Sequence, residues 1–169
     1  MNIKGTVWRF PQDDINTDLI RRKMYAHLPA KEQAVHCLEQ LDAEFGAKVK
    51  PGDIVVAGRN FGAGSSTPVH LALLALGIGA VMAESFGRVF FRSAIAGGLL
   101  VIASPGILDL TNSGDTIEVD VKSGETHNLT TGRTLTNPPL PEFLREMVAL
   151  GGEKPYIKAR LARMREAQA

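Results

Sequence analysis

The central part of the chain consists of short, uninterrupted apolar runs that alternate with amphipathic stretches. The runs at 54–57, 80–83 and 99–103 are typical of strands buried on both faces. Between them, residues 68–76 and 88–96 have helical spacing, and glycine follows each stretch. This order predicts parallel strands joined by right-handed crossover helices.

The N-terminal part has three further patterns. Residues 3–10 are rich in β-formers and end at Pro11, which predicts a strand. The polar run 13–18 has no packing role of its own, so it is either a solvated turn or part of a site. Val35, Leu38, Leu41 and Phe45 have helical spacing, so we expect a helix over 31–45.

The C-terminal part changes in character after Pro105. Residues 116–122 alternate strictly, as in a half-exposed strand, and residues 126–134 are expected to continue it as a hairpin or meander. Prolines at 138–141 form a stiff linker, and helical patterns follow at 143–150 and 155–167. We therefore expect one domain over 1–169, with a helical C-terminal extension from about residue 140.

Composition narrows the class of protein. The chain has 169 residues, of which 44% are apolar and 22% charged, and its formal net charge is +1. These values exclude low-complexity disorder and a large basic surface for nucleic acid. No apolar run reaches the roughly 20 residues of a membrane span, and residues 1–8 lack the apolar core of a signal peptide. We therefore expect a cytoplasmic protein with no nucleic-acid or membrane partner.

Cysteine and histidine offer no metal site. The single cysteine, Cys37, cannot form an internal disulfide and cannot alone hold zinc or an iron–sulfur cluster. It lies among apolar positions, so we expect a buried, unreactive thiol. The histidines at 27, 36 and 127 lack metal-ligand spacing, so we expect no metal bound by this chain.

The loop at 58–68 is the most informative stretch, because three glycines surround two serines between a strand and a helix. Thr67 is expected to cap the helix and Pro68 to begin it. Backbone N–H groups and the hydroxyls of Ser65 and Ser66 would then meet in one small volume, which suits a carboxylate or another anion. A phosphate site for a dinucleotide and a plain turn are the alternatives, but the phosphate-binding fingerprints do not fit.

Four motifs in order carry a resemblance to a known family. Residues 14–20 (Asp-Ile-Asn-Thr-Asp-Leu-Ile) and 60–66 (Asn-Phe-Gly-Ala-Gly-Ser-Ser) are similar to the small subunit of 3-isopropylmalate dehydratase, the swivelling domain of the aconitase superfamily. Residues 52–58 and 85–92 extend the match, which covers residues 1–135. The resemblance implies an α/β fold, a three-layer β/β/α swivelling domain of the aconitase small-subunit type.

The same resemblance implies a function. It predicts a hydro-lyase subunit of leucine biosynthesis that works with a large subunit carrying a [4Fe–4S] cluster, while this chain holds no cofactor. The reaction removes water from a 2-hydroxy acid and adds it back at the neighbouring carbon. By resemblance Ser65 is the base and Asp18 helps to order the site, while Ser66, Gly64 and Thr67 hold a substrate carboxylate. Self-association of the isolated chain is left open.

The chain also departs from the family pattern. Thr67-Pro68-Val69 stands where the family has Arg-Glu-His, so the arginine that would bind a substrate carboxylate is missing. The cations that could replace it are Arg22 and Arg59, with Arg21 and Lys23 as further candidates. Residues 24–30 occupy the place of the family's substrate-recognition loop. Two alternatives follow: a related dehydratase for citramalate, dimethylmalate or a similar acid, or a non-catalytic assembly or binding module.

Overall fold

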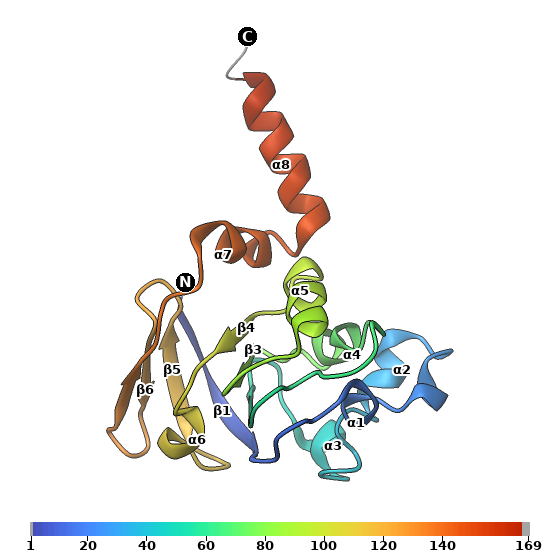
Figure 1. Cartoon of the computed structure of the whole chain (residues 1–169), viewed down its shortest axis with the longest axis vertical. Helices are drawn as coiled ribbons and strands as arrows, with labels where there is room; N and C mark the ends of the chain where they lie inside the picture. The colour runs from blue at the N-terminus through green and yellow to red at the C-terminus, as the bar shows by residue number, and fades with distance from the viewer. Residues whose placement is uncertain (1, 167–169) are drawn as a thin grey trace.

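The computed structural model describes residues 2–166. Its strands form one sheet in the order β4-β3-β2-β1-β5-β6-β7, in which a parallel half and an antiparallel half meet at β1 (Figure 1). The strands are β1 (Asn2–Phe10), β2 (Ile54–Ala57), β3 (Ala80–Ala83), β4 (Val101–Ala103), β5 (Thr116–Asp120), β6 (Glu125–Asn128) and β7 (Thr134–Thr136).

Strand β1 belongs to both halves because it is long enough to pair twice. Its last four residues pair in parallel with β2, and Asn2–Thr6 pair in antiparallel with β5. The helices are α1 (Thr17–Ile20), α2 (Ala30–Ala34), α3 (Phe45–Lys48), α4 (His70–Ala75), α5 (Arg88–Ala96), α6 (Ile107–Leu110), α7 (Glu142–Ala149) and α8 (Glu153–Glu166), with a 3-10 turn η1 (Lys23–Tyr25).

Two separate cores divide the molecule into three layers. Val55 and Ala57 point to one face of the parallel half, where they pack with helical residues such as Leu73 and Phe90. The intervening residues of β2 point to the other face and pack against Ile117 and the other apolar residues of β5. Since a strand alternates its side chains, apolar residues at every position of β2 supply both cores. The predicted three-layer β/β/α fold is confirmed.

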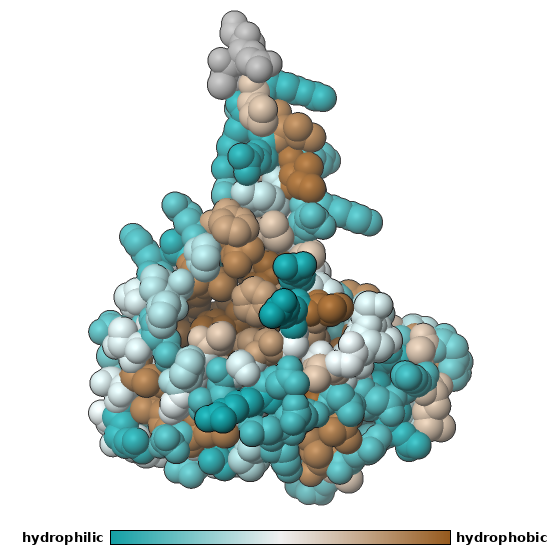
Figure 2. Space-filling view, viewed as in Figure 1, coloured by the Kyte–Doolittle hydropathy of each residue, from teal (hydrophilic) through white to brown (hydrophobic). Residues whose placement is uncertain are grey.

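The C-terminal helices leave the body of the molecule. Figure 1 shows α8 projecting away from α7, and Tyr156 is its one buried residue within the part that the structure describes. The helices expected over 143–150 and 155–167 correspond to α7 and α8, while residue 167 lies outside the described residues. An apolar groove of about 410 Å³ runs beside α7, and Figure 2 shows the hollow beneath α8; its apolar lining includes Phe91, Ile95, Leu144 and Met147.

The helix expected over 31–45 is wrong. Helix α2 ends at Ala34, turns follow, and Leu38 has a φ of 55°. The amide of Leu38 donates to the carbonyl oxygen of Ile20 at 2.9 Å, which takes it out of any helical ladder. Val35, expected on the buried face, is 54% exposed. The buried residues Leu38 and Phe45 are therefore separate anchors of an irregular segment rather than one helix face.

Candidate functional site

The two motif loops meet at one edge of the sheet. Strands β1 and β2 are parallel, so their carboxyl ends lie together, and ligand sites in such sheets form at this edge. The amide of Asp14 donates to the carbonyl oxygen of Arg59 at 2.8 Å, and the amide of Gly62 donates to that of Ile15 at 2.7 Å. The amide of Thr17 donates to the carbonyl oxygen of Ala63 at 2.9 Å. Together these bonds join the loop after β1 to the loop after β2.

Polar side chains reinforce the same junction. Asp13 Oδ1 accepts from the amide of Arg59 at 2.6 Å, and Asp14 Oδ1 accepts from Asn60 Nδ2 at 2.7 Å. Asp14 and Asn60 both have a φ of 56°, a left-handed conformation that Asp and Asn tolerate better than most residues. The polar run 13–18 is therefore more than a solvated turn. Its first residues hold the loop that carries Ser65.

The serine at the tip of the second loop lies in a small cluster of hydroxyls. Ser65 Oγ is 3.1 Å from Thr17 Oγ1 and 2.7 Å from Thr67 Oγ1, and the amide of Thr67 is 3.5 Å from the same oxygen. Ser65, Ser66 and Gly64 are exposed, whereas Thr17 is buried. Sequence reasoning missed Thr17, although it is the threonine of the Asn-Thr-Asp motif. Ser65 is therefore exposed to solvent, while its hydroxyl contacts that of the buried Thr17.

The expected helix cap at Thr67 is wrong. Helix α4 begins at His70, its N-cap residue is Val69, and no side chain caps it. The Thr67 hydroxyl is bonded instead to Ser65. His70 is buried, and burial lowers the pKa of its imidazole, which favours the neutral form. His70 is therefore a packed helix residue.

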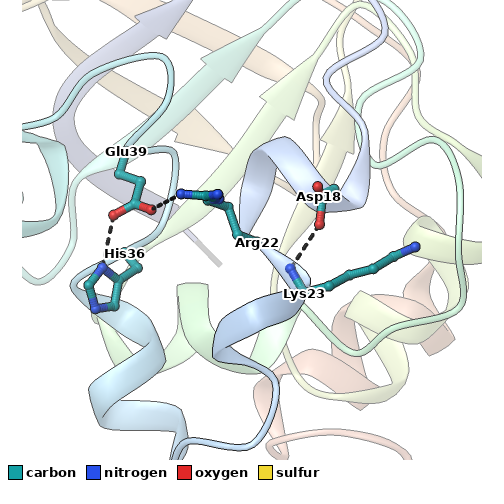
Figure 3. Close-up of polar contacts among 5 residues, drawn as sticks. All are labelled: Asp18, Arg22, Lys23, His36 and Glu39. Atoms are coloured by element: carbon teal, nitrogen blue, oxygen red, sulfur yellow. Dashed lines mark hydrogen bonds and ion pairs between the residues drawn. The ribbon is translucent and has the colours of Figure 1, made fainter.

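Of the other predicted site residues, Asp18 and Arg22 lie on and beside α1, and Arg59 lies in the loop after β2. Asp18 is exposed, and its Oδ1 accepts from the amide of Lys23 at 2.8 Å, so it holds the turn that follows α1 (Figure 3). Arg22 Nη1 is 4.0 Å from Glu39 Oε1, and the Arg22 side chain is 46% exposed. The exposed Arg59 contacts Asp13 through its amide.

The further candidate Arg21 differs from Arg22 and Arg59 because it is only 2% exposed. Of the four cations considered in place of the missing arginine, Arg22, Lys23 and Arg59 are therefore the exposed ones.

Metal-binding groups do not gather within residues 2–166. No cluster of three or more His, Cys, Asp or Glu side chains suits a metal ion in this range. Cys37 is buried, and burial raises the pKa of its thiol to about 12, so it is protonated at neutral pH. The same range holds no helix with the length and hydropathy to span a bilayer.

Comparison with known proteins identifies the family. The aconitase C-terminal domain family matches residues 1–106. The 3-isopropylmalate dehydratase small subunit of Thermodesulfovibrio yellowstonii is 45% identical, over 96% of this chain and 97% of that protein. The isopropylmalate/citramalate isomerase small subunit of Methanocaldococcus jannaschii is 44% identical, over 95% of this chain and 96% of that protein.

A solved structure gives the same answer. The crystal structure of a 3-isopropylmalate dehydratase chain from Methanocaldococcus jannaschii has a TM-score of 0.90 and 37% identity, and the match covers 99% of each chain. The fold and its loop pair therefore define an aconitase-type swivelling domain. The chain belongs to the aconitase C-terminal domain family, among the small subunits of the 3-isopropylmalate dehydratase type.

Proposed function

We propose that this chain is the small subunit of a heteromeric hydro-lyase that dehydrates and rehydrates a 2-hydroxy dicarboxylic acid, as in leucine biosynthesis. The observation that carries the proposal is the exposed Ser65 hydroxyl, which lies between two threonine hydroxyls at the edge of a parallel sheet. The names of relatives that cover nearly the whole chain support it. Its proposed location is the cytoplasm, where a free thiol such as that of Cys37 stays reduced.

In this proposal Ser65 is the general base. Its alkoxide takes the proton from the carbon next to a carboxylate, the released electron pair forms a C=C bond, and hydroxide leaves the neighbouring carbon. Addition of water at the other carbon completes the isomerisation. A serine alkoxide needs fixed donors nearby, and the hydroxyls of Thr17 and Thr67 lie within hydrogen-bond distance of Ser65 Oγ.

The substrate carboxylates are proposed to bind around this tip. Gly64, Ser66 and Thr67 are proposed to supply amide and hydroxyl donors, and Arg22 and Arg59 the positive charge that the substitution at position 67 removed. Asp18 is proposed to order the site, since its carboxylate fixes the turn that leads into Arg22. We expect an altered substrate because the side chain of Thr67 is shorter than that of arginine and carries no charge.

The iron–sulfur cluster expected for this family does not fit the residues of this chain. Residues 2–166 contain one buried cysteine and no group of three metal ligands. We therefore assign the cluster to a large subunit, which would cover the exposed tip and complete the site. No metal and no other cofactor is proposed for the small subunit itself.

The test is to co-purify the chain with its large subunit and to assay 2-isopropylmalate, citramalate, dimethylmalate and citrate. We expect one of them to turn over, and Ser65→Ala to lower kcat by about 100-fold or more, since the base is lost. Ser66→Ala is the matched control and should affect KM more than kcat. If none of the acids is converted by a complex that forms normally, the alternative of a non-catalytic assembly module is favoured.

A further inference from the structure

A second polar cluster lies behind Arg22 and ties two irregular segments together. His36 Nδ1 is 2.8 Å from Glu39 Oε2, while the other oxygen of Glu39 is 4.0 Å from Arg22 Nη1. Figure 3 shows Glu39 between Arg22 and His36, with the Lys23 side chain extending away from Asp18. The ring of Tyr25 stacks on that of His36 at 3.8 Å between centroids and 9° between planes. The neighbouring Glu39 carboxylate is the main cause that raises the pKa of the Tyr25 hydroxyl.

We propose that Glu39 is a positioning residue, which holds the Arg22 guanidinium and the segment 22–28 in the orientation that the substrate requires. This inference rests on the proposed function and adds to it a residue outside the two motif loops. We name the cluster of Arg22, Tyr25, His36 and Glu39 the Glu39 latch.

The chemistry of a guanidinium supports this role. Arg22 has five N–H donors in a fixed plane, so it can form an ion pair with Glu39 at 4.0 Å and still present donors to a substrate carboxylate. A carboxylate on one side fixes the plane of the guanidinium, which makes recognition on the other side more specific. Because the Arg22 side chain is 46% exposed and that of Glu39 24%, the outer donors of Arg22 remain accessible while Glu39 lies further inside.

The local backbone explains why side chains are needed here. Segment 22–28 consists of single turns, in which the amides of Tyr25, Ala26 and Leu28 each donate to a residue three positions earlier. Such isolated turns are weakly stable by themselves. The stacked pair of Tyr25 and His36 and the oxygens of Glu39 connect this segment to the turns around 33–39.

The experiment compares Glu39→Ala and Glu39→Gln with wild type, with Glu44→Gln as the matched control. Glu44 is also a glutamate in an ion pair, with Lys48, but it lies outside the latch. In the complex we expect Glu39→Ala to raise KM for the hydroxy acid about tenfold with kcat within twofold of wild type. Glu39→Gln keeps an oxygen for His36 but loses the charge for Arg22, so it should give a smaller rise.

A second measurement needs no turnover. Amide hydrogen exchange on the full chain alone should become faster at Tyr25, Ala26 and Leu28 in Glu39→Ala, and stay unchanged in the strands of the sheet. The proposal is overturned if exchange at these amides is unchanged, if it rises throughout the chain, or if kcat falls at constant KM. If the wild-type complex converts no hydroxy acid, the proposed function fails, whereas exchange in segment 22–28 still decides whether the latch exists.

Discussion

The base and the tip of the motif loops are built in different ways. At the base, Ile15 and Phe61 are fully buried, and backbone hydrogen bonds join the two loops. At the tip, Gly64, Ser65 and Ser66 are exposed, and hydroxyl groups make the contacts. The base is thus held mainly by buried apolar residues and backbone hydrogen bonds, which the side chains of Asp13, Asp14 and Asn60 reinforce, whereas the contacts at the tip are made by hydroxyl groups.

The base of the loops therefore determines where the site lies, and the tip carries the groups that could react. Backbone hydrogen bonds around a buried core resist movement, so they fix the position of the tip above the sheet. The hydroxyls at the tip remain available because no helix cap uses them: α4 begins at His70 without a side-chain cap. Substitutions at the base should therefore change stability, and substitutions at the tip should change activity.

The largest effect on stability is expected at Gly62, which lies at the base. Its φ is 78°, and a Cβ there would overlap the Cβ and ring of Phe90. We expect Gly62→Ala to lower the free energy of unfolding by roughly 3 kcal/mol or more, from overpacking and backbone strain together. Urea denaturation of the full chain measures it.

The control is Gly132→Ala, where φ is 74° but no atom lies within 4 Å of a new Cβ. It carries the backbone strain without the overlap, so its cost should be about 1 kcal/mol. Equal costs at the two positions would mean that the base is not tightly packed around Phe90.

Thr17 joins the base to the tip, so its substitution should affect both properties. Thr17→Val keeps the shape and removes the hydroxyl 3.1 Å from Ser65. We expect kcat of the complex to fall roughly 10- to 100-fold, because one fixed donor to the alkoxide is lost. The free energy of unfolding should fall by only about 1 kcal/mol. The control is Thr134→Val on the exposed strand β7, which should change neither kcat nor the free energy of unfolding. If Thr17→Val has the same kcat as wild type, Thr17 has no part in the mechanism.

The same distinction explains what the sequence could predict. Continuous apolar runs identify β2 and β3, because burial on both faces needs an apolar residue at every position. Helix α5 matches its expected range, since its apolar spacing and its closing glycines are local signals. The antiparallel hairpin of β5 and β6 follows from alternation in the same way.

The failures came from contacts that the pattern of apolar and polar positions does not reveal. The amide of Leu38 bonds Ile20, and this contact across the chain overrides the helical spacing around Leu38. The hydroxyl of Thr67 bonds Ser65 rather than capping α4, and Thr17 contacts the same serine oxygen. The order of residue types along the chain does not determine which group a hydroxyl will bond. The roles of Ser65, Asp18, Arg22 and Arg59 in binding and catalysis stay predictions.

The sharpest contrast between buried and exposed groups is expected from thiol reactivity. Burial raises the pKa of Cys37 from 9.0 to about 12. At pH 8 its thiolate fraction in the folded chain should therefore be about 1,000-fold lower than in the unfolded chain, and reaction with a thiol reagent correspondingly slow. Since the folded pKa is the higher one, Cys37 contributes stability that is complete below pH 9 and is lost as the pH rises towards 12.

A cysteine at the tip provides the comparison. Ser65→Cys in a Cys37→Ala background puts the only thiol at an exposed position, and it should react at a rate close to that of the unfolded chain. The absorbance of the group that the thiol reagent releases measures both labelling rates, that of Cys37 and that of the cysteine at position 65. The Cys37→Ala chain should also lose the change in stability between pH 9 and 12 that belongs to the Cys37 thiol. A tip cysteine that reacts as slowly as Cys37 would mean that the loop is closed over Ser65, in which case a second polypeptide could not deliver a substrate to it.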